Sequence, residues 1–303
     1  MTDSSLSPEI PERLFANWRA RLPDFYALTR IDRPIGILLL GWSMLWGLWV
    51  GADGWPGFKL FVIFALGCVL TRSAGCCIND YADRHFDGHV ARTAKRPLAT
   101  GRVLPGEALW LAAGMTGLAG LLVLLTNAAT IQLAVVAVAL AAAYPFCKRV
   151  THLPQLVLGA AFGMSIPMAF AATTGSVPAI GWALFAVSLV WSTAYDTQYA
   201  MTDREDDIKI GIKSTAILFG RWDVLAVAAM QAAVLAGLAA IGLSLGYGVF
   251  WWLGLLIAAS LAVYQIALIR DRDPARCFTA FLNNHYLGMA VFAGLAIDRA
   301  LAG

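Results

Sequence analysis

Long apolar runs separated by short polar segments make up most of this 303-residue chain. A helix that crosses the roughly 30 Å hydrocarbon layer of a membrane needs about 20 mostly apolar residues. Nine runs come close to this length, and we predict a membrane-spanning helix at each: 34–51, 58–78, 108–126, 128–146, 154–172, 180–198, 222–243, 248–269 and 278–298. The pattern therefore predicts an all-α, multi-pass membrane protein.

The composition supports this prediction. Apolar residues make up 59% of the chain and charged residues only 14%, which leaves too little charge to cover a water-facing surface. We expect membrane lipid around the spans, and neither a nucleic-acid partner nor an obligate protein partner.

The distribution of Lys and Arg predicts the orientation. Basic residues are retained on the cytoplasmic side of a membrane, and here they collect before residue 34 and in the connections that follow the even-numbered spans. Only Lys59 and Arg299 fall on the opposite side, and Arg72 lies inside the second span. We therefore expect a cytoplasmic N-terminus, a cytoplasmic segment over residues 1–33, and cytoplasmic loops near 79–107 and 196–221.

An acidic segment closes the second span. On a helix, with about 100° per residue, Asn79, Asp80, Asp83 and Asp87 are predicted to share one face. A grouping of this kind costs mutual repulsion unless cations lie between the carboxylates. Because hard oxygen ligands are what Mg²⁺ prefers, this segment predicts a magnesium site.

A second segment repeats the spacing 120 residues later, at the end of the sixth span. Tyr199, Asp203 and Asp207 correspond to the first segment, and Asp196 lies on the same predicted helical face. The repetition suggests two related halves that face one cavity.

Basic residues border both acidic segments: Arg84, Arg92, Lys95, Arg96, Lys209 and Lys213. Carboxylates, magnesium and Lys or Arg together are the usual composition of a diphosphate site. Cytoplasmic retention alone explains most of the basic residues, and the two explanations have at best equal weight for Lys95, Arg96, Arg102 and Arg221. Arg72 is a functional candidate because a charge inside a span is costly, although pairing with a helix-end carbonyl would also explain it.

With these two segments the chain resembles the intramembrane prenyltransferases of the UbiA type. The run from Asn79 to His89 is similar to their NDxxDxxxD signature, and the run from Tyr195 to Asp207 is similar to their second Asp motif. Further similarity lies in Arg33 to Gly36, Tyr144 to Arg149 and Thr151 to Gln155, so five motifs in order cover nearly the whole chain.

The resemblance implies nine helices around a central cavity, within one prenyltransferase domain over residues 34–303. It implies Mg²⁺ held by Asn79, Asp83, Asp87, Asp203 and Asp207, with Asp196 and Tyr199 as alternatives for completing the second site. It also implies that Arg149 binds a substrate anion. We expect substrate contacts from Arg72, Arg84, Lys95, Lys148, Arg149, Asp196, Tyr199 and Lys213, and catalytic roles for Asp83, Asp87, Asp203, Asp207 and Arg149.

The expected reaction transfers a polyprenyl group from polyprenyl diphosphate to the ring of 4-hydroxybenzoate, ortho to its hydroxyl. Stabilisation of the leaving diphosphate and exclusion of water from the carbocation are the two demands of this chemistry. A naphthoate, haem or chlorophyllide precursor is the alternative acceptor. A cation-coupled transporter and a non-catalytic polyprenyl-lipid scaffold are the alternatives from other classes of protein.

Overall fold

The computed structural model describes residues 18–89 and 92–302, so residues 1–17 of the predicted cytoplasmic segment lie outside the described residues. The described part is helical and contains no strand. In chain order its helices are α2 (Trp18–Leu28), α3 (Ile35–Ala52), α4 (Phe58–Asp83), the short 3₁₀ helix η1 (Asp87–His89), α5 (Pro105–Val123), α6 (Ala128–Val150), α7 (Pro154–Gly163), α8 (Ser165–Thr174), α9 (Ala179–Ile210), α10 (Thr215–Phe219), η2 (Gly220–Trp222), α11 (Asp223–Ser244), α12 (Val249–Ile269) and α13 (Pro274–Ala302).

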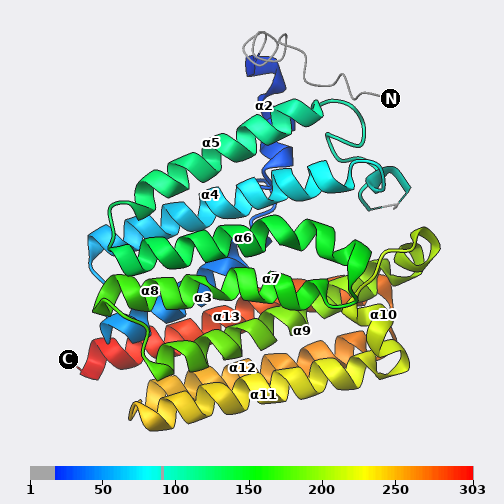
Figure 1. Cartoon of the computed structure of the whole chain (residues 1–303). Coiled ribbons are helices and arrows are strands. Elements are labelled where there is room, and N and C mark those ends of the chain that lie inside the picture. The colour runs from blue at the N-terminus through cyan, green and yellow to red at the C-terminus, as the bar shows by residue number, and fades with distance from the viewer. Residues whose placement is uncertain (1–17, 90–91, 303) are drawn as a thin grey trace.

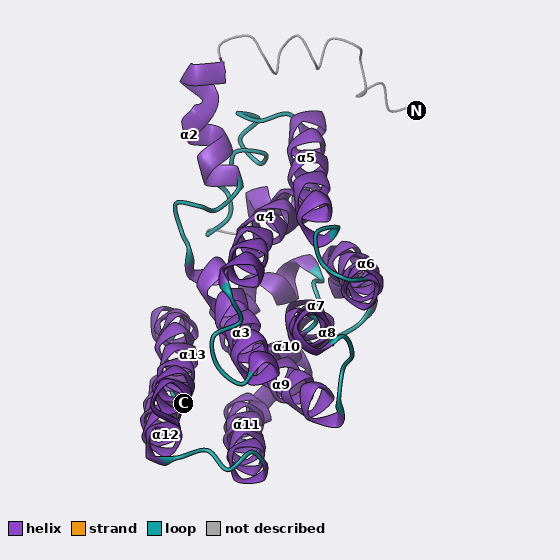
Figure 2. Cartoon of the chain, turned by 90° about the vertical axis from the view of Figure 1, so that its left-hand side faces the viewer, coloured by secondary structure: helices purple, strands orange, loops and turns teal. Residues whose placement is uncertain are grey.

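The long helices run side by side (Figure 1) and are seen close to end-on in Figure 2, where α2 lies across them. In the described chain, eight helical segments are long and apolar enough to cross a membrane, with α7 and α8 counted as one segment and α10, η2 and α11 as another. These candidates lie at eight of the nine predicted spans, and the all-helical multi-pass fold is confirmed.

Helix α9 is the exception among the predicted spans. It is 32 residues long, but it is not one of the eight, because its aliphatic run gives way to polar residues from Ser192 to Gln198. Several of these, including Ser192, Thr197 and Gln198, are buried against neighbouring helices. The polar half of α9 therefore faces protein, where hydrogen-bond partners are available.

Local sequence explains where α6 begins and where α9 ends. Asn127 caps α6, because its side-chain oxygen accepts a hydrogen bond from the N–H of Thr130 at 2.9 Å. Gly211 ends α9 with a φ of 73°, a conformation that glycine adopts without strain. The chain then turns back, and the N–H of Lys213 donates to the carbonyl of Lys148 at 3.0 Å. The ends of α6 and α9 are thereby tied together.

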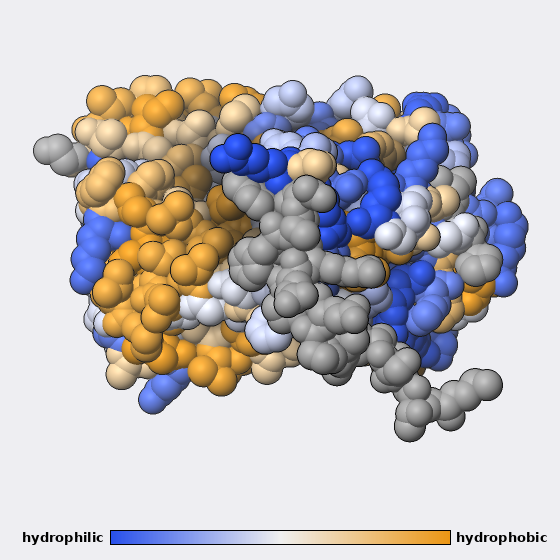
Figure 3. All heavy atoms as spheres, turned by 90° about the horizontal axis from the view of Figure 1, so that it is seen from above, coloured by the Kyte–Doolittle hydropathy of each residue, from blue (hydrophilic) through white to orange (hydrophobic). Residues whose placement is uncertain are grey.

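The apolar core lies between α3, α8, α9, α11, α12 and α13. Its centre holds the stacked rings of Trp46 and Trp191, whose centroids are 4.8 Å apart. Tyr195 packs edge-on against Trp191 at 5.3 Å. In the space-filling view of Figure 3, apolar residues cover most of the left half of the visible face and hydrophilic residues gather toward the right-hand end. The molecule therefore has an apolar body and a polar end.

A close glycine contact joins α12 to α13. A Cβ added at Gly254 would lie 2.6 Å from the carbonyl oxygen of Ala290 and 3.0 Å from the Cα of Gly294. Small residues of this kind let helix backbones approach closely in a membrane.

We predict that Gly254→Ala lowers the thermal unfolding midpoint of the detergent-solubilised protein, because overpacking costs about 1–3 kcal/mol and outweighs the helix propensity of alanine. Gly114→Ala is the matched control, since nothing lies within 4 Å of a Cβ at that position on α5. An equal midpoint for both variants would show that the α12–α13 contact is not tight.

Candidate diphosphate and metal site

A cavity of about 130 Å³ lies at the polar end of the molecule, where α4, α6 and α9 end. Both acidic segments contribute to its wall. The predicted residues that line it are Asn79, Asp83, Asp87, Lys148, Asp196, Tyr199, Asp203, Asp207 and Lys213. Segments more than 100 residues apart in the sequence are thus brought to one place.

The first acidic segment is not a single helix. Helix α4 ends at Asp83, and Asp87 follows a turn and begins η1. Asn79 and Asp83 lie one turn apart, and the amide of Asn79 donates to Asp83 at 3.2 Å. Asp80 is 1% exposed and does not line the cavity. The prediction that these four residues share one helical face is therefore wrong, because the helix ends before Asp87.

The second acidic segment is helical throughout. Helix α9 continues to Ile210, and Asp196, Asp203 and Asp207 all line the cavity. Tyr199 lies between them on the same face, and its ring packs beneath the guanidinium of Arg92, 4.6 Å from the ring centroid. The predicted stripe on α9 is confirmed.

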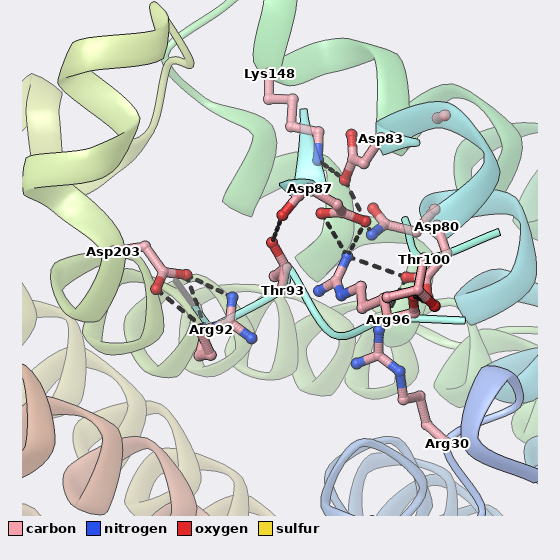
Figure 4. A network of polar contacts seen from close by, with 12 residues as sticks. Arg30, Asp80, Asp83, Asp87, Arg92, Thr93, Arg96, Thr100, Lys148 and Asp203 are labelled. Atoms are coloured by element: carbon pink, nitrogen blue, oxygen red, sulfur yellow. Dashed lines mark hydrogen bonds and ion pairs between the residues drawn. The ribbon is translucent and has the colours of Figure 1, made fainter. Parts of the chain in front are cut away.

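Basic side chains form ion pairs with three of the cavity carboxylates (Figure 4). Lys148 forms an ion pair with Asp83, Arg92 donates to both oxygens of Asp203 at 3.1 Å, and Arg96 donates to both oxygens of Asp87 at 2.9 Å. Each of these basic residues also lines the cavity. The wall therefore carries acids and bases together, which is the charge pattern of a site for a metal ion and a polyanion.

Burial shifts the ionisation of two of these acids. It raises the pKa of Asp207 to about 7, and repulsion from Asp203 is the next cause. Burial likewise raises the pKa of Asp87, against the attraction of Arg96. The charged forms of both groups are thus disfavoured unless further cations are present.

The donor set fits a divalent ion in chemistry, but the ligands are not preassembled. Within residues 18–89 and 92–302, no three His, Cys, Asp or Glu side chains are grouped closely enough to hold a metal. Asp83 nevertheless keeps one buried oxygen, Oδ1, without a hydrogen-bond partner. A cation that entered the cavity would satisfy this oxygen and compete with Lys148 and Arg92 for the carboxylates.

Four predicted substrate-binding residues lie outside the wall of this cavity: Arg72, Arg84, Lys95 and Arg149. Arg84 donates to the carbonyl of Tyr81 at 2.8 Å and covers that ring, and Lys95 is exposed. Arg149 donates to the carbonyl of Ala82 and lines a second, neighbouring cavity together with Lys148 and Asp83.

Arg72 lies deeper, inside α4. Its Nη1 donates to the Sγ of Cys76 at 2.6 Å, whereas its buried Nε has no hydrogen-bond partner. Gly36 makes room for the guanidinium, since a Cβ there would overlap with Nε. Arg72 is therefore a buried cation with one N–H that lacks a hydrogen-bond partner, and this costs free energy inside a membrane protein.

Arg92 and Arg96 were named only as basic residues that border the acidic segments, and no substrate contact was predicted for either of them. The expected bias of basic residues toward the cytoplasmic side is enough to explain their presence in the sequence. Only the structure shows that both side chains contact carboxylates of the cavity. Tyr144 and Gln155 also line the cavity. Gln155 closes the run from Thr151 that resembles the family, but no role was predicted for it, and its side chain accepts from the N–H of Thr215 at 3.0 Å.

The chain belongs to the UbiA prenyltransferase family, whose model matches residues 40–289. A relative from Alkalilimnicola ehrlichii named 4-hydroxybenzoate octaprenyltransferase is 56% identical over 285 residues, which cover 94% of this chain and 97% of the relative.

Solved structures share the fold. A UbiA homologue from Aeropyrum pernix K1 in its apo form gives a TM-score of 0.77 at 26% identity, covering 89% of this chain and 98% of that one. A UbiA homologue from Archaeoglobus fulgidus, bound to GPP and Mg²⁺, gives 0.65 at 17% identity, covering 89% and 99%.

We predict that Arg92→Gln tightens binding of Mn²⁺, used as a magnetic-resonance probe for Mg²⁺, roughly fivefold in the absence of substrate. The side chain of Arg92 is 29% exposed, and release of Asp203 from a partly exposed ion pair is worth about 1 kcal/mol. Lys209→Gln removes the same charge from a surface pair with Asp206 and should leave Mn²⁺ affinity unchanged. Equal affinities for both variants and the parent would contradict competition at Asp203.

Proposed function

We propose that this chain catalyses Mg²⁺-dependent transfer of a polyprenyl group from polyprenyl diphosphate to 4-hydroxybenzoate, giving 3-polyprenyl-4-hydroxybenzoate for ubiquinone biosynthesis. The observation that carries the proposal is the convergence of both acidic segments and several basic side chains on one cavity. That cavity lies at the polar end of an apolar helical body. Family membership and the names of the relatives support the same reaction.

Mg²⁺ would be held by Asn79, Asp83, Asp87, Asp203 and Asp207, four carboxylates and an amide that line the cavity. When bound, it supplies electrostatic stabilisation of the leaving diphosphate. The UbiA homologue from Archaeoglobus fulgidus, which was solved with GPP and Mg²⁺ bound together, supports this assignment.

The basic residues of the wall bind the diphosphate. Lys148 and Arg92 are paired with Asp83 and Asp203, and both basic side chains would be free to contact phosphate oxygens if these carboxylates held a metal ion. Lys213 lines the same cavity. As the allylic carbon–oxygen bond breaks, its electron pair leaves with the diphosphate, and these cations stabilise the charge that develops.

The acceptor carboxylate is assigned to one of two arginines. Arg72, inside α4, has a buried Nε without a hydrogen-bond partner, and Arg149, at the polar end, lines the second cavity. The ring carbon ortho to the hydroxyl forms the new bond to the allylic carbon and then loses its proton. Asp196, the cavity acid closest to the apolar half of α9, is our candidate for the proton acceptor. The surrounding helices exclude water from the carbocation.

The topology that fits this chemistry has nine spans in one domain over residues 34–303, in which α9 spans the membrane in addition to the eight segments named above. The N-terminus is cytoplasmic, and the site lies at the cytoplasmic face of the bacterial inner membrane. Two features support it: the basic residues of the chain collect at the end that holds the cavity, and α9 is long enough to span. The other residues proposed for substrate contacts, Arg84, Lys95 and Tyr199, lie on or near this end.

We predict that Asp83→Asn and Asp203→Asn each lower Mg²⁺-dependent transfer at least 100-fold, because an amide binds magnesium more weakly than a carboxylate and leaves charge on the diphosphate uncompensated. The measurement is incorporation of radiolabelled 4-hydroxybenzoate into a lipid-extractable product by the purified protein. Asp271→Asn, a change at a surface pair with Arg276, is the control and should keep full activity. Near-normal transfer by both site variants would end the proposal.

The same assay can measure which isoprenoid chain length the protein prefers in its diphosphate donor. The relatives' name specifies an octaprenyl group, so we expect the highest kcat/KM with an eight-isoprene diphosphate among a graded series. An acceptor series with a naphthoate in place of the hydroxybenzoate tests the ring specificity. A lipid-extractable product from a radiolabelled naphthoate, with none from 4-hydroxybenzoate, would reassign the acceptor and leave the reaction class intact.

A further inference from the structure

Asp80 belongs to the first acidic segment but differs from its neighbours in the folded chain. Its side chain is 1% exposed, and it does not line the cavity that Asn79, Asp83 and Asp87 line. A buried carboxylate without a cation is costly. The basic residues that pair with Asp80 therefore indicate its role.

Two arginines satisfy Asp80 (Figure 4). Arg30, which follows α2, donates to both oxygens at 2.9 and 3.1 Å. Arg96, from the loop before α5, places Nη1 3.1 Å from Oδ1. Arg30 has a φ of 56°, a left-handed conformation that non-glycine residues rarely adopt. The chain thus accepts local backbone strain where Arg30 reaches Asp80.

The three basic side chains on the cavity acids are not equivalent. Lys148 and Arg92 pair with Asp83 and Asp203, and both acids are proposed magnesium ligands. A metal ion therefore removes the acidic partner of each of these two bases.

Arg96 is held differently. It pairs with Asp87, a proposed ligand, and also with Asp80, which lies outside the cavity wall. If Asp87 bound a metal ion, the ion pair with Asp80 would still hold Arg96 at the cavity wall. Because Arg30 already neutralises the charge of Asp80, the positive charge of Arg96 remains available to an anion in the cavity.

We infer that Asp80 is a positioning residue that fixes the Arg96 guanidinium as a preorganised diphosphate contact, with Arg30 holding Asp80 in turn. The inference rests on the proposed function, because the anion in question is the diphosphate of the donor. Preorganisation matters here, since an arginine held in place loses little freedom when it binds a phosphate bidentately. The arrangement connects the turn after α2 to the diphosphate through Arg30 and Arg96, which are 66 positions apart in the sequence.

The test is a double-mutant cycle on the full-length protein in detergent, with inorganic pyrophosphate and Mg²⁺ as the probe in isothermal titration calorimetry. Asp80→Asn and Arg96→Gln should each weaken pyrophosphate binding roughly tenfold, as expected for loss of a hydrogen bond to a charged group. The double variant should be no weaker than Arg96→Gln alone, because Asp80 acts through Arg96. Losses that multiply in the double variant would overturn the inference, and so would unchanged binding by Asp80→Asn.

Two controls separate positioning from damage to the fold. Asp24→Asn makes the same change in a carboxylate that pairs with Arg102 at 2.7 Å, and it should bind pyrophosphate as the parent does. The KM for 4-hydroxybenzoate should be unchanged in Asp80→Asn, whereas a general disturbance would raise it together with the KM for the donor, which would count against the inference. If Asp80→Asn does not fold, Arg30→Gln/Asp80→Asn removes the orphaned charge and should show the same selective loss.

The parent protein distinguishes this inference from the proposed function. If the parent does not bind pyrophosphate with Mg²⁺, the proposed function fails. If the parent binds and Asp80→Asn binds equally well, the function stands and the positioning role is wrong.

Discussion

Carboxylates gathered at the end of an apolar bundle need cations, and the rest of this structure follows from that need. Asp83, Asp87 and Asp203 are largely buried, and each lies against a Lys or Arg from another part of the chain. In surroundings of low dielectric constant, like charges repel strongly and opposite charges attract strongly. Under the proposed function, a metal ion and a polyanion replace these internal pairs without leaving an uncompensated charge.

The fold supplies what this exchange requires. Helices α4 and α9 carry the acids to the polar end, and Gly211 turns the chain so that Lys213 is tied to the end of α6. The apolar body behind the cavity offers a water-poor environment next to the polar one. A reaction that joins a lipid-soluble chain to an aromatic acid by way of a diphosphate needs both environments in contact.

The sequence predicted the helical architecture well, because hydrophobic runs of membrane length carry a strong signal. It also predicted the stripe on α9, because 3.6-residue periodicity continues through Asp203 and Asp207. It failed where helix ends decide the outcome: nothing in the run from Asn79 to Asp87 signals that α4 ends at Asp83. The contact of Arg30 with Asp80 could not be predicted from the sequence, because the two residues are 50 positions apart and only the tertiary structure joins them. The contacts of Arg96 could not be predicted either, because basic residues on this side are expected in any case.

The exchange of internal ion pairs for metal and diphosphate is the central claim, and its most direct test is whether the two ligands depend on each other. Pyrophosphate would be titrated into the purified protein with Mg²⁺ and again with the divalent ions removed by a chelator. Strongly cooperative binding is predicted, with pyrophosphate affinity at least tenfold higher when Mg²⁺ is present, because metal binding frees Lys148 and Arg92. Equal affinity under both conditions would contradict the account.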